Sequence, residues 1–336
     1  MPAASQKKPA PKKAAGRKPA IRGGIDLGGT KIQTVVVGAR GKVLGEARRQ
    51  TPTEGGPEDV AKEMAGAMRE AAEAGGVETK DLKGIGVGSP GDADENTGVV
   101  SAAKNLPGWD GSFPLADWLA KELGTKNVKV GNDVQVAVQA EFQLGAAKPY
   151  KSVLGIWWGT GVGGGLILDG KPWLGRGAAA EVGHMVIKRN GAKCTCGRRG
   201  CMEAYAGRMA MEIKARQDVK DGAETDLFKL MEKHGRDRLS SGIWERALEH
   251  EDKLAQELIN RALTALGTGI ASAVNLVDPE AVIIGGGMGS RFGERFLPEI
   301  KKEALKHLFV DDNPAPMEIA ALGDLGGAVG AALLVA

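Results

Sequence analysis

Three apolar runs of β type dominate this chain, and each ends in a cluster of glycines. The runs lie in GGIDLGGTK (23–31), VLGIWWGTGVGGG (153–165) and AVIIGGGMG (281–289). Glycine loses more conformational entropy on folding than any other residue, so a glycine cluster is best used where the backbone must approach a partner closely. Backbone N–H groups at such turns commonly bind phosphate. The three runs therefore predict several strand-end turns that can approach a ligand.

Helical patterns separate the three runs. Apolar residues recur three and four positions apart over 57–76, 133–145 and 253–278, which predicts helices there. Residues 33–50 predict a hairpin around ARGK, and the charged, weakly periodic residues 214–250 predict surface helices. Strands that alternate with helices indicate an α/β fold. Because 336 residues exceed the size at which one core keeps growing, we expect two packed halves.

Composition excludes several classes of protein. The chain is 42% hydrophobic and 26% charged, which is typical of a soluble globular protein. No apolar run approaches the roughly 20 residues of a membrane span, so we expect no membrane partner. Its three cysteines cannot all pair, which favours a reducing compartment. We therefore expect a cytoplasmic protein whose thiols are free or metal-bound.

Positive charge is concentrated in residues 1–20, which contain six Lys or Arg and no acidic residue. The remainder has 39 basic and 42 acidic residues, so the net charge of +3 for the whole chain comes from these first 20 residues. The remainder is close to neutral and indicates neither a nucleic-acid surface nor a nucleic-acid partner. Ala, Pro and Lys cannot build a core, which predicts a disordered basic tail over 1–20. The tail also lacks the hydrophobic region of a signal peptide. Weak contact with polyanions is the alternative role for it.

The first glycine turn, in DLGGTK, has the groups that a phosphate site needs. Gly28 and Gly29 can present backbone N–H groups, Thr30 a hydroxyl and Lys31 a cation. Asp26, at the strand end, could hold Mg²⁺ through water. A glycine turn in a plain hairpin looks similar, and this alternative stays open for the motif taken alone.

The second glycine turn also matches the G-x-G-x-x-G pattern of dinucleotide-binding folds at residues 159–164. That pattern requires a helix to open at the glycines, whereas LILDGKPWLG follows here, an apolar strand with an Asp-Gly turn. We therefore reject the dinucleotide fold. Two strand-glycine turns, each with a hairpin, suit a nucleotide held between two related halves. Asn105 and Asp133 are polar interruptions near the predicted cleft, although an isolated Asp133 could equally cap a helix.

The motifs GIDLGGTK, NLPGW, GNDV, GTGVGGG, AEVGH, CTCGRRGCME and VIIGGGM occur in this order, and the set closely resembles the ROK family of sugar kinases and repressors. The resemblance covers residues 22–336. It implies an α/β, duplicated ribonuclease-H-like fold of the actin and hexokinase type, with ATP and a hexose bound in a cleft between two lobes. Two motifs depart from the family pattern. VGSPGDAD (87–94) stands where many members read V-P-G-P, and Trp157 and Trp158 stand where smaller apolar residues are common.

The resemblance also implies a division of the chain. We expect an N-terminal lobe over 21–134 and a C-terminal lobe over 135–336, with a zinc-binding insertion at 184–201. The C-terminal helix is expected to pack back on the N-terminal lobe. We also expect a homodimer or a higher homo-oligomer.

All three cysteines lie beside one histidine in HMVIKRNGAKCTCGRRGC (184–201), the most specific part of the resemblance. His184, Cys194, Cys196 and Cys201 form a Cys₃His set, which suits a structural Zn²⁺ with tetrahedral geometry and no open position. The alternative, buried thiols and a core histidine, fits poorly with the polar, glycine-broken sequence. The metal would fix the direction of His184 and orient a sugar-binding loop.

Individual site residues also follow from the resemblance. Asp133 is expected to be the catalytic base that accepts the proton of the sugar hydroxyl. Sugar-binding residues are expected to be Asn105, Asn132, Asp133, Glu181, His184 and Glu203. The residues expected to bind ATP and its Mg²⁺ are Asp26, Gly28, Gly29, Thr30, Lys31, Gly159, Thr160, Gly161, Gly286 and Gly287. Asp110 and Asp117 are other acids near the base in sequence, and both are expected to be solvated.

Two classes of function remain, a sugar kinase and a sugar-responsive repressor. Repressors of the family carry a winged-helix domain ahead of the first glycine loop, whereas only a short stretch poor in apolar residues precedes it here. We therefore expect an enzyme that phosphorylates a hexose with ATP, with glucose at the 6-hydroxyl as the first choice. Fructose, N-acetylglucosamine and N-acetylmannosamine are alternative sugars, and polyphosphate is an alternative donor.

Overall fold

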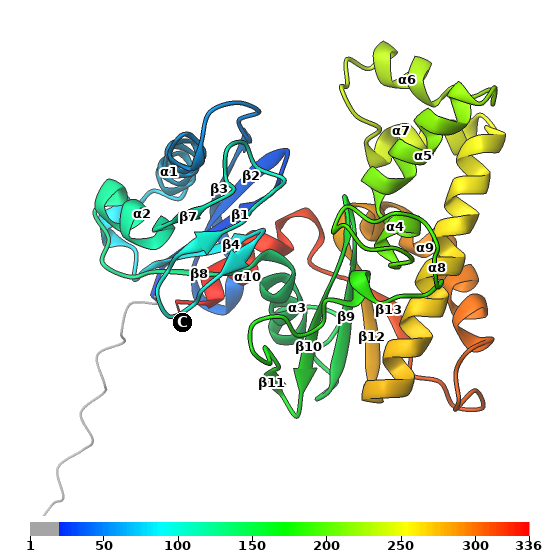
Figure 1. Cartoon of the computed structure of the whole chain (residues 1–336). Coiled ribbons are helices and arrows are strands. Elements are labelled where there is room, and N and C mark those ends of the chain that lie inside the picture. Colours follow the sequence, from blue (N-terminus) through cyan, green and yellow to red (C-terminus); the bar gives the residue numbers. More distant parts are fainter. Residues whose placement is uncertain (1–19, 336) are drawn as a thin grey trace, which may run out of the picture.

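Two five-stranded mixed sheets organise the protein in the computed structural model, which describes residues 20–335 (Figure 1). The first sheet has the strand order β3-β2-β1-β4-β8, and the second has the order β11-β10-β9-β12-β13. In both sheets two antiparallel pairs are followed by two parallel pairs. The predicted duplicated α/β fold is therefore confirmed. The basic tail predicted for residues 1–20 lies, except for Ala20, outside the described residues.

The strands of each sheet are short and follow the apolar runs. The first sheet consists of β1 (Arg22–Leu27), β2 (Lys31–Val37), β3 (Val43–Gln50), β4 (Ile85–Ser89) and β8 (Val128–Asn132). The second consists of β9 (Val153–Trp158), β10 (Val162–Leu168), β11 (Lys171–Pro172), β12 (Ala281–Gly285) and β13 (Met317–Ile319). A small third sheet joins β5 (Asp92–Ala93), β6 (Val100–Ser101) and β7 (Ser112–Phe113).

The predicted local elements are confirmed. The three expected helices are α1 (Pro57–Ala74), α3 (Asp133–Leu144) and α8 (Lys253–Val277). The hairpin predicted over 33–50 is β2 and β3, joined through the short helix η1 (Ala39–Gly41). After the second glycine turn the chain forms β10 and β11, and Asp169 and Gly170 between them have φ of 49° and 77°. Positive φ at both positions is characteristic of a type I′ hairpin turn, so the rejection of a dinucleotide fold is also correct.

The helices of residues 208–249 are less superficial than the sequence pattern suggests. They are α5 (Arg208–Lys220), α6 (Leu227–Lys233) and α7 (Ser241–Glu249). Trp244 of α7 is fully buried, in a cluster with residues of α8 and α9 (Gly286–Leu305). The prediction of surface helices describes the exposed, charged face of α7, but its apolar face, which packs on the core, was not predicted.

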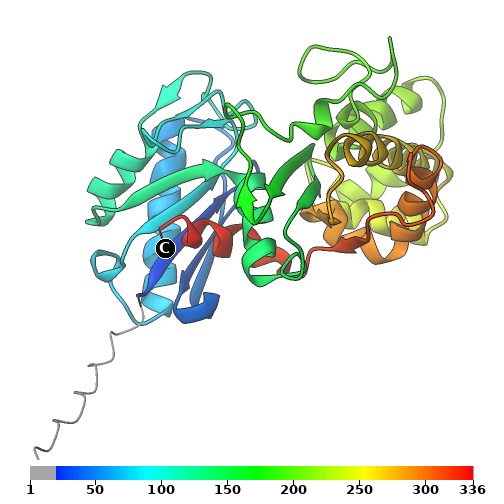
Figure 2. The same ribbon diagram turned by 90° about the horizontal axis from the view of Figure 1, so that it is seen from below.

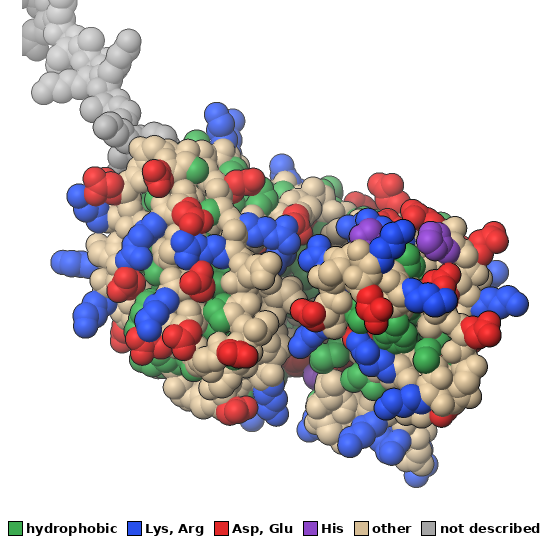
Figure 3. Space-filling model, turned by 90° about the horizontal axis from the view of Figure 1, so that it is seen from above, with side chains coloured by type: hydrophobic (Ala, Val, Ile, Leu, Met, Phe, Trp, Pro, Cys, Tyr) green, Lys and Arg blue, Asp and Glu red, His purple; other side chains and the backbone are tan. Residues whose placement is uncertain are grey.

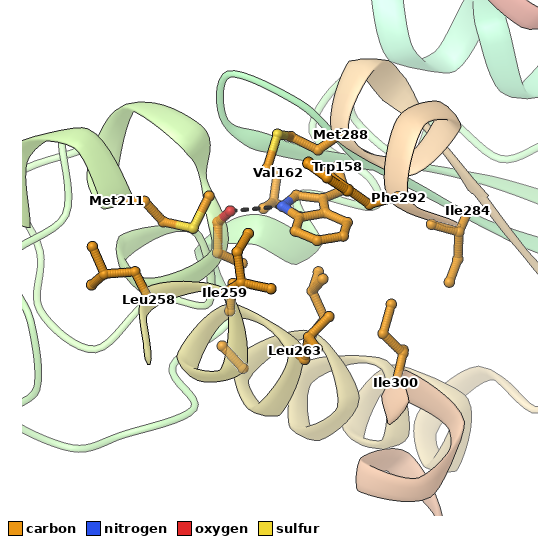
Figure 4. Packing of buried hydrophobic residues seen from close by; sticks show 14 of the residues in the cluster. Trp158, Val162, Met211, Leu258, Ile259, Leu263, Ile284, Met288, Phe292 and Ile300 are labelled. Carbon is orange, nitrogen blue, oxygen red and sulfur yellow. Dashed lines mark hydrogen bonds between the residues drawn. The ribbon is translucent and has the colours of Figure 1, made fainter. Parts of the chain in front are cut away.

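The largest core lies between the second sheet and these helices. Figure 4 shows Trp158 of β9 among Leu263, Met288 and Phe292, with its indole N–H donating to the carbonyl oxygen of Ala206 at 2.8 Å. This bond ties the end of β9 to α4 (Glu203–Ala206). A second core lies on the first sheet. There α1 and α2 (Leu115–Leu123) cover the face of the sheet that points away from the second sheet (Figure 1).

Two helices, α3 and α10 (Gly326–Leu333), lie between the sheets. On neighbouring strands of the first sheet, a Cβ atom at Gly24 would be 2.0 Å from the carbonyl oxygen of Ala328, and one at Gly86 would be 1.7 Å from that of Ala331. The red C-terminal helix in Figure 2 is accordingly pressed against the blue strands. Backbone-to-backbone approach of this kind requires glycine in the strands.

On the other side of this layer, α3 packs on glycines of the second sheet through its valine side chains. A Cβ atom at Gly155 would lie 2.2 Å from a methyl carbon of Val138, and one at Gly163 would lie 2.7 Å from a methyl carbon of Val134. The two helices also touch each other, since a Cβ atom at Gly330 would lie 2.5 Å from the carbonyl oxygen of Val136. The two central helices, α3 and α10, therefore pack on glycine positions of the two sheets.

The chain passes between the halves twice at this layer, through residues 145–152 after α3 and through residues 320–325 before α10. Across residues 20–335, no helix combines the length and the apolar character that a membrane crossing needs.

Replacing Gly86 by alanine should destabilise the protein strongly. The new methyl group would meet the backbone of α10, which cannot move aside as a flexible side chain could. Overpacking of this kind costs about 1–3 kcal/mol and occasionally more. The melting temperature measured by differential scanning calorimetry should therefore fall by several degrees. The matched control is Gly111→Ala, because no atom lies within 4 Å of a Cβ there. Equal melting temperatures for the two variants would contradict the close contact between Gly86 and the backbone of α10.

Candidate functional site

The first glycine turn, Gly28–Thr30, is held in place by Thr51, the residue that follows β3. Thr51 donates its hydroxyl to the carbonyl oxygen of Gly28 at 2.6 Å, and its backbone N–H donates to that of Thr30 at 3.3 Å. Asn105 lies over the turn, since a Cβ atom at Gly29 would be 3.1 Å from its side-chain nitrogen. The predicted phosphate-binding turn and Asn105, a predicted sugar-binding residue, are thus neighbours.

Lys31, the predicted phosphate-binding cation, forms an ion pair with a residue from the C-terminal part of the chain. Its Nζ lies 2.7 Å from the carboxylate of Asp324, which also faces Arg48 at 3.6 Å. Asp324 belongs to the short helix η4 (Gly323–Leu325) that precedes α10. The pair brings an acidic residue from the C-terminal part of the chain to the first glycine turn.

The start of α3 places Asn132 and Asp133 at the end of β8. Asn132 is the N-cap, and its side-chain oxygen accepts from the backbone N–H groups of Val134 at 3.1 Å and Gln135 at 3.2 Å. Asp133 is the first helical residue, and its carboxylate accepts from the N–H of Val134 at 2.9 Å. The capping role considered for Asp133 therefore belongs to Asn132.

Asp26 and Asp133 form a crowded pair of acids at this edge of the first sheet. Burial raises the pKa of Asp26 to about 7, with a further increase from the negative charge of Asp133 and a smaller one from Asp324, whereas Lys31 acts in the opposite direction. Burial also raises the pKa of Asp133 to about 6, and Glu181 adds to the rise while the hydrogen bond from Val134 opposes it. Perturbed carboxyl groups of this kind are typical of functional sites.

The second glycine turn, Gly159–Gly161, is anchored to the start of α5. The backbone N–H groups of Arg208 and Met209 donate to the carbonyl oxygens of Gly159 at 3.1 Å and Thr160 at 3.0 Å. The guanidinium of Arg208 donates to the Thr160 hydroxyl at 2.8 Å and to the carbonyl oxygen of Leu239 at 2.8 Å. Burial lowers the pKa of Arg208 from its ordinary value.

The third glycine cluster lies beside the second. A Cβ atom at Gly159 would be 3.8 Å from the backbone nitrogen of Gly287. Gly286 has a φ of 82°, and a Cβ there would be 2.6 Å from the carbonyl oxygen of Trp158. Only glycine fits this turn, which brings the N-terminus of α9 to the end of β9.

His184, Cys194, Cys196 and Cys201 converge on one point. Their donor atoms all lie within 4.8 Å of one another, the Sγ atoms of Cys196 and Cys201 are 3.8 Å apart, and the Sγ of Cys194 is 3.8 Å from Nδ1 of His184. Two thiolates bound at about 2.3 Å to a tetrahedral zinc lie about 3.8 Å apart. The geometry therefore fits the predicted metal, and Nδ1 facing the thiols leaves Nε2 as the second ring nitrogen.

Glu203 connects this cluster to the second glycine turn. One of its oxygens accepts from the backbone N–H of Val162 at 3.0 Å, and the other accepts from the hydroxyl of Thr195 at 3.1 Å. Glu181 precedes the short helix η3 (Val182–His184) and acts on the pKa of Asp133 from the second half of the molecule.

The structure thus groups the expected site residues in two sets that face each other. Asp26, the first glycine turn, Asn105, Asn132 and Asp133 lie at the first sheet, and the other two glycine turns, Glu181, Glu203 and the Cys₃His cluster lie at the second. Figure 3 shows a hollow between the two halves of the molecule. Asp110 and Asp117 are exposed, as expected. Sequence reasoning missed Asp324 and Arg208, although DLGG at 324–327 repeats part of the first glycine motif.

Comparisons with known proteins cover nearly the whole chain. The sequence profile of the ROK family matches residues 22–336. A glucokinase of Thermotoga maritima is 33% identical over 286 residues, which cover 85% of this chain and 87% of that protein. A glucokinase of Halalkalibacterium halodurans is 34% identical over 93% of this chain and 94% of its own. The crystal structure of a ROK family glucokinase from Streptomyces griseus, in complex with glucose and AMPPNP, aligns with a TM-score of 0.80 and 32% identity over 94% of this chain and 99% of its own.

Proposed function

Because the chain belongs to the ROK family, we propose that it is a sugar kinase that transfers the terminal phosphoryl group of ATP to the 6-hydroxyl of glucose. The observation that carries this proposal is the position of Asp133. Its carboxylate lies at the N-terminus of α3, next to Asp26 and the first glycine turn and opposite Glu181 of the other half. The glucokinases among its relatives support glucose as the sugar.

In the proposed reaction Asp133 accepts the proton of the sugar hydroxyl. The hydroxyl oxygen forms a bond to the terminal phosphorus, the bridging P–O bond breaks, and ADP leaves with the electron pair. Phosphoryl transfer asks a protein mainly for positioning and charge neutralisation, so one well-placed carboxylate is sufficient as base. The side chains proposed to hold the sugar are Asn105, Asn132, Glu181, His184 and Glu203.

The donor phosphates are proposed to lie between the first two glycine turns. Lys31 would exchange part of its contact with Asp324 for a phosphate oxygen, and Gly159–Gly161 would present backbone N–H groups. Gly286 and Gly287, adjacent to Gly159, are proposed to lie at the adenosine. Asp26 has the ligand type and place to hold Mg²⁺ through water, and the bound ion neutralises phosphate charge.

The Cys₃His cluster is proposed to hold a structural Zn²⁺. Four protein ligands close a tetrahedral site, so the metal would supply folding energy rather than Lewis-acid chemistry. Its location orders the loop that carries His184 and, through Glu203, the second glycine turn.

Fructose, N-acetylglucosamine and N-acetylmannosamine remain alternative sugars, with polyphosphate as an alternative donor. A repressor without enzymatic activity is the alternative class. A coupled ADP-release assay over these sugars, with a phosphate-transfer assay for polyphosphate, separates them. Failure of every sugar and donor pair would contradict the kinase proposal.

Protein purified without added metal should contain about one zinc per chain, because one group of four potential metal ligands converges among residues 20–335. Inductively coupled plasma mass spectrometry measures the ratio. Cys196→Ser should lose the metal and lower the melting temperature, since a site with three ligands binds more weakly. Active wild-type protein with a zinc content near zero would contradict the proposal.

Asp133→Asn should lower kcat by about 10²- to 10⁴-fold, the usual contribution of a general base. Asn132 still caps α3, and the burial that raises the pKa of Asp133 penalises its charged form. The neutral variant should therefore melt at the same temperature as the wild type or higher. Asp110→Asn, at an exposed acid in the neighbouring loop, is the control and should keep full activity. A kcat for Asp133→Asn above about a tenth of wild type would exclude Asp133 as the base.

The pH profile should show an acid limb set by Asp133. Its pKa is raised from 3.8 to about 6, and the base must be ionised, so kcat/KM for glucose at saturating Mg-ATP should fall as the pH drops through about 6. The profile should be flat above about pH 7 until other groups titrate. Full activity maintained down to about pH 4.5 would show that no base with a raised pKa is required.

A further inference from the structure

A buried carboxylate lies where the chain crosses between the two halves. Glu141, near the end of α3, is only 2% exposed. Its Oε2 accepts from the backbone N–H groups of Ala146 at 2.8 Å and Ala321 at 3.0 Å, and its Oε1 accepts from that of Leu322 at 2.8 Å. Ala146 belongs to the outgoing crossing, 145–152, whereas Ala321 and Leu322 belong to the returning one, 320–325. One side chain therefore joins both crossings.

The surroundings of Glu141 fix its carboxylate in this place. A Cβ atom at Gly145 would lie 1.9 Å from Oε2, so glycine is needed for the chain to turn around it. The carbonyl oxygen of Glu141 also accepts from the N–H groups of Gly145 at 2.9 Å and Ala147 at 3.1 Å. A second link runs parallel to the first, since the Tyr150 hydroxyl donates to Glu318 of β13.

An acceptor-only group suits this position better than any neutral side chain. Three N–H groups point at the two oxygens, and a buried carboxylate is tolerated when such charge-assisted bonds satisfy it. A glutamine has one oxygen, so whichever way its amide turns, its NH₂ group faces at least one of the three N–H groups. The site therefore requires two acceptor oxygens and not merely the shape of the side chain.

We propose that Glu141 is a positioning residue, a clamp that fixes the pivot about which the two halves of the molecule close. The inference rests on the proposed kinase function. The opposite end of α3, about 12 Å from Glu141 at 1.5 Å per residue, carries Asp133. The clamped segment 320–325 carries Asp324, the partner of Lys31. Through these two connections one carboxylate sets the place of the base and of the first glycine turn relative to the second sheet.

The test compares Glu141→Gln with Glu280→Gln. Glu280 also accepts backbone hydrogen bonds, from Lys151 and from Ser152 at 3.1 Å, but these bonds join only the end of the outgoing crossing, just before β9, to the residue before β12. Hydrogen exchange is measured by mass spectrometry over 145–152 and 320–325, and kcat and KM for glucose are measured well below the melting temperature of each variant.

For Glu141→Gln we expect exchange in both crossings to accelerate by at least about tenfold, because a charge-assisted bond is lost. We expect kcat to fall by about tenfold or more, since small misplacements of reacting groups have effects of this size. Zinc content should be unchanged. Glu280→Gln should alter kcat by less than about twofold and leave exchange in 320–325 unchanged, because its bonds do not reach that segment.

Two results would overturn the proposal. In one, Glu141→Gln exchanges faster but keeps a kcat within twofold of wild type; in the other, exchange in the crossings does not change. If the Glu141→Gln variant does not fold, hydrogen exchange of the wild-type protein tests the proposal instead. The amides of Ala146, Ala321 and Leu322 should be protected both without ligands and with glucose and a non-hydrolysable ATP analogue, as a pivot requires. Fast exchange in either state overturns the clamp. Exchange does not depend on turnover, so a wild-type protein without activity would contradict the kinase function and not the clamp.

Discussion

The fold depends on the close contact between two central helices and the glycines of two sheets. α10 lies on Gly24 and Gly86, α3 lies on Gly155 and Gly163, and the two helices touch at Gly330. Because glycine has no Cβ atom, the helices and strands approach each other more closely at these points than ordinary side chains allow. The distance between the halves, and with it the spacing of the two glycine turns that face each other, is set by this layer.

Local patterns predicted much of the fold because they act over short stretches of chain. The apolar runs, the helical periods of α1, α3 and α8, and the Asp-Gly turn at 169–170 all have local causes. The purpose of several glycines was not predictable in this way. Gly155 and Gly163 lie in the same apolar run and glycine cluster as the predicted phosphate turn, yet they contact α3. A sequence cannot distinguish a helix from a ligand as the partner of a missing Cβ. Trp244 was missed because the charges of α7 obscure its single apolar face.

The candidate site was predictable where one motif carries several residues and was missed where it depends on distant ones. DLGGTK and GNDV each place a turn and an acid together, so the resemblance could assign them. The pairing of Lys31 with Asp324 spans 293 residues, and that of Glu141 with Leu322 spans 181. The repeat of DLGG at 324–327 is the one local signal for the first pair, and we found none for the second. The burial that raises the pKa of Asp26 and of Asp133, and the further rise that the charge of Asp133 causes at Asp26, likewise arise only when β1 and α3 are brought together.

The order of elements along the chain has a consequence for synthesis on the ribosome. The glycine seat in β1 and β4 is complete once residue 89 has emerged, but α10, which covers it, begins at residue 326. At a translation rate of about 5–20 residues per second, this backbone surface waits on the order of 10–50 s for its helix. In the second half, α3 is synthesised before the strands that it covers, so these strands can pack on it as soon as they emerge. The first-made half of the nascent chain is therefore the last to mature, and it is the part that most needs protection by chaperones during translation.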